Sequence, residues 1–271
     1  MNIKCIYIAS LLLLITSCAR REAVVVAGST AFQPFAEEIA EEYMQKYPDL
    51  NITVQGGGSS VGIQSALNGV AQIGMADLVT LPPVAASLVK HVAANDGVVM
   101  VVNPANPVAN ITTQQVRDVY LGKINDWKDL GGVDKQITVI SREAGSGTRS
   151  SFEDLVFQGG ALRQDAIIGD SNGTVREQVA NDPNAIGYIS NGNVNNRVKP
   201  LTLEGIACSV NAITCGNYKL VRPIYLLTTS TVSVQTQKFL DYILGPEGQK
   251  TIHDEGLIPA HLYEPKSEKK N

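Results

Sequence analysis

The chain has 271 residues, of which 44% are apolar and 18% are charged, so it can form one or two sizeable hydrophobic cores. Its formal charge of −4 argues against a nucleic-acid-binding protein, because such proteins normally carry a basic surface. The three histidines lack metal-ligand spacing and the four cysteines include no C-x-x-C motif, so we expect no metal ion and no cofactor.

The first residues are typical of an export signal. An apolar run follows Lys4 and is too short to span a bilayer comfortably, so residues 1–17 are interpreted as a signal peptide. Ile15-Thr16-Ser17-Cys18 resembles the bacterial lipobox, which predicts a lipid on Cys18. We therefore expect an extracytoplasmic protein, anchored to the cell membrane or periplasmic. The alternative is an ordinary secretory signal with an incidental cysteine.

Three segments share one pattern: a β-rich apolar run, a turn rich in glycine and serine, and apolar residues at helical spacing. They occupy residues 23–47, 51–69 and 137–156. This alternation predicts an α/β fold with mainly parallel sheets. In such sheets the turns lie at the carboxyl edge, where ligands bind.

The three turns are suited to binding an anion. Each leaves free backbone N–H groups at the start of a helix, and the helix dipole places partial positive charge there. Glycine allows close approach of the backbone, and serine and threonine add hydroxyl groups. One such turn is usually no more than a helix cap, but three of the same composition predict an anion site.

Two charged side chains refine this hypothesis. The planar guanidinium of Arg142, just before the third turn, could hold the oxygens of an oxyanion. Asp77 follows a strand-like run and could accept a hydrogen bond from a protonated anion such as hydrogenphosphate. Fully ionised sulfate would offer that carboxylate only repulsion. The alternative for Asp77 is a role in a turn or helix cap.

The sequence gives Ser59 and Ser146 no catalytic motif. It contains no P-loop and no G-x-G-x-x-G, and neither serine is the central residue of a G-x-S-x-G elbow. The histidines lie far in sequence from the three turns, so neither serine has an evident general base. A secreted serine hydrolase or phosphatase is therefore disfavoured, and we expect a binding protein rather than an enzyme.

We make two further predictions, one for the cysteines after the signal peptide and one for the end of the chain. Cys208 and Cys215 lie in one loop, and outside the cytoplasm such a pair most simply forms a disulfide. Two free thiols are the alternative. The lysine-rich residues 264–271 are expected to form a disordered tail.

Several segments together, in this order, resemble the phosphate-binding lipoproteins of bacterial and archaeal phosphate ABC transporters. The resemblance covers residues 24–259 and rests on GSTA (28–31), QGGGS (55–59), IGMAD (73–77), DGVVMVVNP (96–104), GKINDW (122–127), REAGSGT (142–148), AIGY (185–188) and GPEGQ (245–249). It implies a two-lobed periplasmic-binding-protein clamshell, in which each lobe is a mainly parallel sheet flanked by helices. Two crossovers, near residues 99–103 and 220–224, would leave residues 18–102 and 222–263 in lobe one and 103–221 in lobe two.

The resemblance also implies which residues contact phosphate. Asp77 would accept a hydrogen bond from the phosphate proton. Arg142 would be the charged donor, and Ser29 and Ser60 would be additional donors. The complete implied set is Ser29, Thr30, Ala31, Ser59, Ser60, Asp77, Arg142, Ser146, Gly147 and Thr148.

Two positions depart from the family pattern. Long relatives carry an aspartate two residues after this arginine, which holds it in place, whereas here that position is Ala144. Glu143 lies next to Arg142, and the sequence leaves open whether it takes over that role. Leu78 follows Asp77 where many short relatives have a Ser-Arg pair.

The resemblance implies a monomeric receptor that binds inorganic phosphate outside the cytoplasm and delivers it to the membrane permease subunits of an ABC importer. Nucleic acid is not an expected partner, and the membrane is contacted through the lipid anchor. The alternatives are a receptor for sulfate, molybdate or tungstate, and a phosphate-sensing module.

Overall fold

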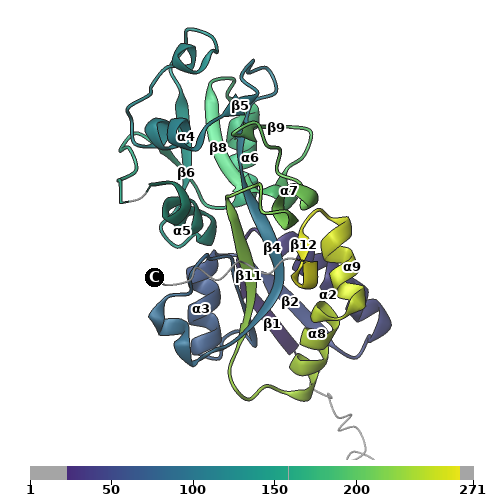
Figure 1. Cartoon of the computed structure of the whole chain (residues 1–271). Helices are drawn as coiled ribbons and strands as arrows, with labels where there is room; N and C mark the ends of the chain where they lie inside the picture. Colours follow the sequence, from purple (N-terminus) through teal and green to yellow (C-terminus); the bar gives the residue numbers. More distant parts are fainter. Residues whose placement is uncertain (1–22, 158, 263–271) are drawn as a thin grey trace, which may run out of the picture.

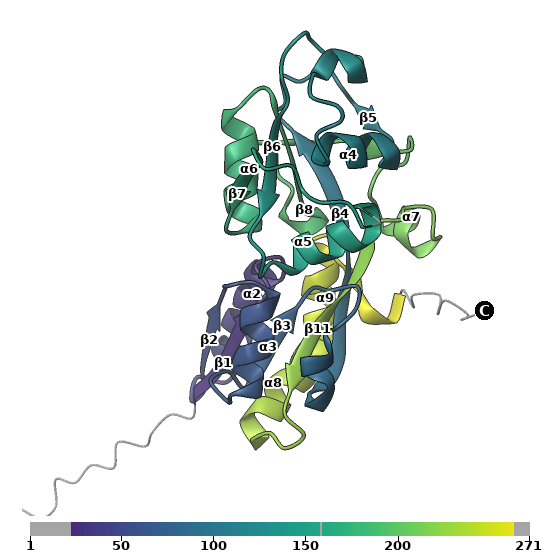
Figure 2. The same ribbon diagram turned by 90° about the vertical axis from the view of Figure 1, so that its left-hand side faces the viewer.

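The computed structural model describes residues 23–157 and 159–262. The predicted signal peptide, Cys18 and the predicted tail at 264–271 lie outside the described residues. Figures 1 and 2 show two lobes stacked end to end and joined by two long strands. We call them the terminal lobe, which holds both ends of the described chain, and the middle lobe. None of the helices within the described residues is long and apolar enough to cross a membrane.

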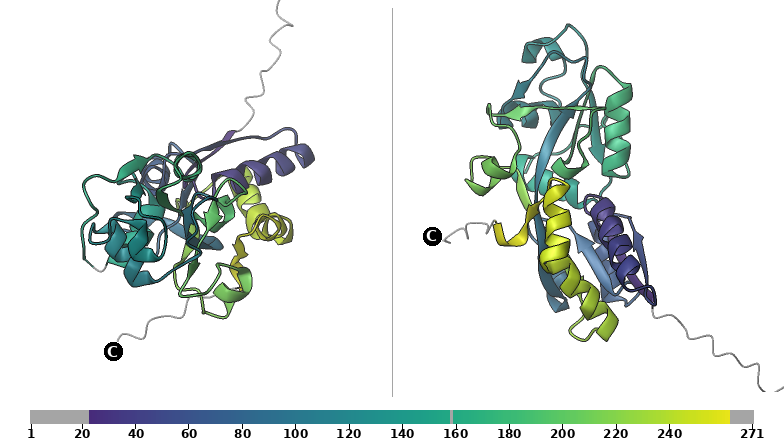
Figure 3. Two further views of the ribbon diagram at one scale, coloured as in Figure 1. Left: turned by 90° about the horizontal axis from the view of Figure 1, so that it is seen from above. Right: turned by 90° about the vertical axis from the view of Figure 1, so that its right-hand side faces the viewer.

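The terminal lobe is a sheet with helices on both faces. Its parallel strands, in the order β2-β1-β3, are β1 (Ala23–Gly28), β2 (Asn51–Gln55) and β3 (Ile73–Ala76). The helices α2 (Gln33–Lys46), α8 (Val234–Leu244) and α9 (Pro246–Asp254) pack together on one face, as the right-hand view of Figure 3 shows. The other face is covered by α3 (Ser59–Leu67) and the short helix η2 (Pro83–Ser87).

The middle lobe repeats this arrangement. Its parallel strands, in the order β8-β6-β7, are β6 (Thr138–Arg142), β7 (Ile167–Gly169) and β8 (Ala185–Ser190). Its helices are α4 (Thr113–Tyr120), α5 (Gly147–Phe152), α6 (Asn172–Asn181) and α7 (Val210–Thr214), with short turns at η3 (Trp127–Leu130), η4 (Glu153–Phe157) and η5 (Asn191–Asn193). Two short strands, β5 (Asn110–Ile111) and β10 (Thr202–Leu203), pair with each other outside the main sheet.

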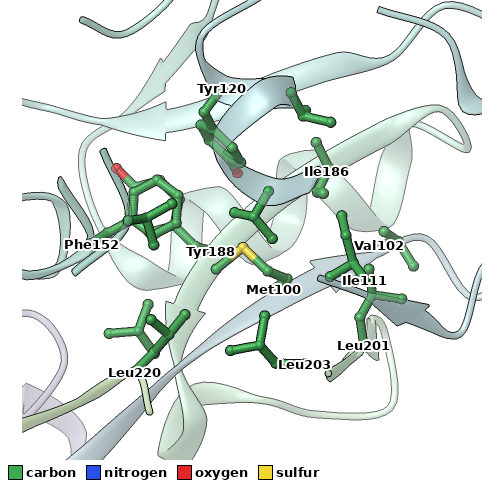
Figure 4. Close-up of a cluster of buried hydrophobic side chains, with 14 of the residues drawn as sticks. Met100, Val102, Ile111, Tyr120, Phe152, Ile186, Tyr188, Leu201, Leu203 and Leu220 are labelled. Carbon is green, nitrogen blue, oxygen red and sulfur yellow. The ribbon is translucent and has the colours of Figure 1, made fainter. Parts of the chain in front are cut away.

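Aromatic rings and aliphatic side chains fill the core of the middle lobe (Figure 4). The rings of Phe152 and Tyr188 stack with centroids 4.1 Å apart, and Tyr120 packs edge-on against Phe152 at 4.8 Å. Because Phe152 is the last residue of α5, this packing fixes the helix whose first residues belong to the predicted third turn.

Two neighbouring strands join the lobes, and one of them runs through both. The 14-residue strand β4 (Val89–Val102) and the strand β11 (Val221–Thr228) are antiparallel to each other. They join the two parallel sheets into one, in the order β2-β1-β3-β11-β4-β8-β6-β7. The shorter strands β9 (Lys199–Pro200) and β12 (Ile258–Pro259) add to β4, and η6 (Ala260–Leu262) closes the described chain. Parallel pairing thus holds for the strands that carry the predicted turns.

The crossing strand β4 changes partner within its length. It pairs with β11 as far as Gly97 and with β8 from Val98 onward. The return crossing lies at Leu220, whose carbonyl accepts from Val98 N at 2.8 Å, just before β11 begins. Both crossings therefore lie side by side at the level where the lobes meet.

The structure contradicts the expected disulfide, because Cys208 and Cys215 are both free thiols. The sulfur of Cys208 packs inward, where a Cβ on Gly97 would lie 2.2 Å from it. Cys215 is exposed beyond the far end of α7, with its sulfur 3.5 Å from the Asn211 amide oxygen. The intervening helix therefore directs the two sulfurs into different environments.

We predict that Cys215 reacts rapidly with a thiol reagent in the native protein and that Cys208 does not. Burial raises the pKa of the Cys208 thiol, which keeps it in the unreactive protonated form. Cys215→Ser should remove one fast-reacting thiol, whereas Cys208→Ser should leave the fast phase unchanged. Thiols that appear only after reduction would show instead that the two cysteines are bonded.

Candidate functional site

The strand–helix turns singled out in the sequence meet where the two lobes face each other. The terminal lobe supplies residues after β1, at the start of α3 and after β3, and the middle lobe supplies residues after β6 and at the start of α6. The backbone itself joins the two sides, since Ser60 N donates to the Gly145 carbonyl at 3.2 Å. The turns that the sequence singles out therefore lie together at one place.

The Asp77 carboxylate lies at the centre of this convergence and is almost fully buried. Its Oδ1 accepts from the Ser59 hydroxyl at 2.6 Å and its Oδ2 accepts from the Thr148 hydroxyl at 3.0 Å. Ser59 also accepts from Asp77 N at 3.0 Å. Since Ser59 and Asp77 belong to the terminal lobe and Thr148 to the middle lobe, one carboxylate links both.

Gly147 allows this close contact. A Cβ at its position would lie 2.1 Å from Ser59 Oγ and 2.5 Å from Asp77 Oδ1, so any other residue would push the lobes apart. Gly58, at the N-cap of α3, has φ = 85°, and a Cβ there would lie 2.8 Å from the Gly145 carbonyl oxygen. The glycines in these turns therefore serve close approach between the lobes.

Arg142 is held in place by its neighbour in sequence. Its Nε and Nη2 each donate to a different Glu143 carboxylate oxygen at 2.9 Å, and Nη2 also donates to Thr30 Oγ1 at 3.3 Å. The side chain is buried, yet its Nη1 has no hydrogen-bond partner among the described residues. Glu143 therefore fills the role that the sequence left open, and one strong donor stays free in the site.

The remaining predicted residues divide into two groups. Ser29 and Ser146 use their hydroxyl oxygens as caps: Ser29 accepts from Ala31 N and Phe32 N at 3.2 Å, and Ser146 accepts from Arg149 N at 3.1 Å. Ser60 is exposed, and its backbone rather than its hydroxyl contacts the other lobe. Ser29 and Ser146 thus shape helix starts, and their backbone N–H groups are also paired, with the Met75 carbonyl at 3.0 Å and the Glu143 carbonyl at 3.1 Å.

Sequence reasoning missed Asn172, the first residue of α6. This buried side chain donates to Thr30 Oγ1 at 3.1 Å and lies 3.5 Å from Thr148 Oγ1, while its oxygen accepts from Ser190 N at 3.0 Å. The signal was present, because β7 followed by Ser171 and a helix is a fourth copy of the strand–turn–helix pattern.

Sequence reasoning also missed Arg222, a fully buried cation in β11. Its Nη1 lies 2.6 Å from Asp77 Oδ2, and its Nη2 lies 2.8 Å from Asp96 Oδ2. Burial raises the pKa of Asp96, and the neighbouring Arg222 guanidinium opposes that shift. A single arginine in an apolar strand was the only available signal, since a buried charge requires a partner.

The arrangement can hold a small oxyanion that carries a proton. It offers the free Nη1 of Arg142, hydroxyl groups, an amide, and backbone N–H groups at helix starts. A carboxylate has about four acceptor positions, and Asp77 receives one hydrogen bond on Oδ1 and two contacts on Oδ2, so Oδ1 can accept one more donor. Across the described residues, no group of three histidine, cysteine or acidic side chains could hold a metal ion.

A comparison with protein-family models matches residues 16–247 to the PBP superfamily domain. Among curated proteins, the phosphate-binding protein PstS of Bacillus subtilis is 33% identical over 242 residues, which cover 88% of this chain and 80% of the relative. The phosphate-binding protein PstS of Borreliella burgdorferi is 27% identical over 248 residues, which cover 87% and 89% respectively.

Two solved structures agree in both sequence and fold. One, from Clostridium perfringens with bound phosphate, is assigned as a phosphate ABC transporter substrate-binding protein. It is 36% identical, covers 88% of this chain and 99% of its own, and has a TM-score of 0.85. An ABC-type phosphate transport receptor from Vibrio cholerae is 34% identical, covers 87% and 99%, and has a TM-score of 0.72.

Proposed function

The chain belongs to the PBP superfamily and, within it, to the phosphate-binding proteins of ABC transporters, and we propose that it binds phosphate in the site between its lobes. It is a transport receptor rather than an enzyme, and its function is phosphate binding for an ABC phosphate importer. The observation that carries the proposed site is the buried Arg142, whose Nη1 has no hydrogen-bond partner among the described residues while its Nη2 donates to Thr30 Oγ1 of the other lobe at 3.3 Å.

The proposed contacts combine one cation with many neutral donors. Arg142 Nη1 would form the charge-assisted hydrogen bond, which is the strongest kind available in the site. Hydroxyl, amide and backbone N–H groups would satisfy the other oxygens. We assign these contacts to Ser29, Thr30, Ala31, Ser59, Ser60, Ser146, Gly147 and Thr148, as the sequence predicts, and add Asn172 because it contacts both Thr30 and Thr148.

The lobes are proposed to meet at the crossing strands. The partner change of β4 between Gly97 and Val98 supports a first crossing just before the predicted residues 99–103, and the start of β11 at Val221 supports a second within 220–224. Both strands would then carry the hinge of the clamshell.

Asp77 is proposed to select phosphate by accepting a hydrogen bond from its protonated oxygen. We predict that isothermal titration of the wild type gives one phosphate per chain and that excess sulfate does not compete. Asp77→Asn should reduce the preference for phosphate over sulfate by about tenfold or more, since a hydrogen bond to a charged group is worth about 1.5–3 kcal/mol. Asp129→Asn, on an exposed turn, is the control and should behave as wild type.

Two outcomes of this titration would contradict the proposal. If sulfate displaces phosphate from the wild type, the protein is a less selective oxyanion receptor, and molybdate and tungstate become candidates. If Asp77→Asn keeps the wild-type preference, Asp77 is not the group that detects the proton.

Glu143 is proposed to fix the direction of Arg142. We predict that Glu143→Gln weakens phosphate binding by about tenfold, because glutamine has one acceptor oxygen and no charge to hold Nε and Nη2 together. The matched control is Glu153→Gln, which breaks a similar pair, to Arg149 Nε at 2.7 Å. An unchanged affinity in Glu143→Gln, measured by the same titration, would rule out this role.

We further propose that the protein is anchored to the membrane by a lipid on Cys18 and delivers phosphate to permease subunits. The lipobox-like residues 15–18 support the anchor, and a site built from one chain is consistent with a monomer. The alternative is a phosphate-sensing role, in which the partner is a membrane sensor instead of a permease.

We predict that Cys18→Ser moves the protein from the membrane fraction to the soluble fraction in cell fractionation, without changing phosphate affinity. Cys215→Ser is the control and should stay with the membrane. A Cys18→Ser protein that remains membrane-bound would exclude the lipid anchor, and copurification with a membrane sensor instead of a permease would favour the sensing alternative.

A further inference from the structure

Arg222 lies behind the site rather than in it. Its guanidinium is fully buried, and β11 places it between β3 and β4 in the sheet. Asp77 directly follows β3, and Asp96 is the cross-strand partner of Arg222 on β4. The cation therefore sits between two carboxylates that neighbouring strands hold on either side.

The contacts of Arg222 are divided between these two acids. Its Nη1 lies 2.6 Å from Asp77 Oδ2 and 3.4 Å from the Asp77 carbonyl oxygen, while Nε and Nη2 bond Asp96 Oδ2 at 3.2 and 2.8 Å. Asp96 Oδ1 is occupied by Ser190 Oγ at 3.0 Å and by Asn191 N at 3.2 Å. Every guanidinium nitrogen thus has an acidic partner.

The charge state of Asp77 decides what the site accepts. An ionised carboxylate only accepts hydrogen bonds, so it suits an anion that carries a proton and repels one that does not. A protonated carboxyl becomes a donor and could bond an oxygen of fully ionised sulfate. A buried carboxylate without a counter-charge favours the protonated form, because desolvation penalises the charge.

We propose that Arg222 is a positioning residue that sets the selectivity of the site: its charge keeps Asp77 ionised, and thereby excludes unprotonated oxyanions such as sulfate. This inference rests on the proposed phosphate function and deepens it. Arg222 acts only through Asp77, because its Nη1 contacts Oδ2 of the carboxylate, whereas Ser59 Oγ donates to Oδ1.

Apart from Arg222, the side chains that contact Asp77 carry no charge. The helices α3 and α5 present the hydroxyl groups of Ser59, Thr148 and Ser151, which are neutral. The second charged group in the network is Asp96 on β4, which is negative when ionised and would favour protonation of Asp77.

The test is the ratio of phosphate to sulfate affinity, measured by titration from about pH 8 to about pH 5. The wild-type ratio should stay high over this range, because phosphate keeps at least one proton and the contact between Arg222 and Asp77 is kept. In Arg222→Met the ratio should fall as the pH is lowered, by about tenfold or more at the acidic end, since Asp77 becomes a donor. Arg222→Lys, which restores one charge, should recover part of the selectivity.

Two further variants separate this role from a structural one. Asp96→Asn removes a buried charge from the same network but leaves Arg222 beside Asp77, so it should keep the wild-type ratio. Arg222→Met combined with Asp77→Asn should show no pH dependence of the ratio, because no titrating group remains at that position. If Arg222→Met does not fold, Arg222→Met with Asp96→Leu removes the charge pair together and takes its place.

The proposal is overturned if a folded variant without the Arg222 charge keeps the wild-type ratio at every pH. It is also overturned if the pH dependence persists without Asp77. A wild type that fails to bind phosphate, or binds sulfate equally well, would instead contradict the proposed function itself, so the two failures are distinguishable.

Discussion

A buried carboxylate at the junction of two lobes is the constraint on which the rest of the structure depends. Asp77 is 2% exposed, and a charge in that position is stable only with donors on every side. The donors come from three elements: the start of α3, the first turn of α5 and the strand β11. The lobes are held at the spacing that this one group requires.

The sheet topology explains how those donors reach one point. Parallel strands deliver their turns to the same edge, and so the glycine- and serine-rich segments of each lobe face each other across the junction. The two crossing strands are antiparallel to their neighbours and carry the buried ions Asp96 and Arg222 into the same plane. The crossing strands therefore supply the counter-charge of Asp77.

Arg142, the other buried arginine of the site, is paired with an acid that is adjacent in sequence. Arg142 is buried and needs an acidic partner, which the family pattern places two residues further along the chain. Here Glu143, the adjacent residue, bonds two of its nitrogens and leaves the third free. Glutamate has a longer side chain than aspartate, and here its carboxylate bonds the guanidinium from the adjacent position.

The sequence by itself determined the α/β class, the strand–turn–helix junctions, and the importance of Asp77 and Arg142, because each depends on a few adjacent residues. Tertiary structure alone decided the partners of these charges. Arg222 is 145 residues from Asp77 and 126 from Asp96, and Asn172 is 142 residues from Thr30, so no local pattern connects them. The cysteines show the same limit: their closeness in sequence favoured a disulfide, but packing of one sulfur against Gly97 and exposure of the other keep them apart. Turns and helix starts depend on adjacent residues, whereas the pairing of buried charges depends on which strands the fold places next to each other.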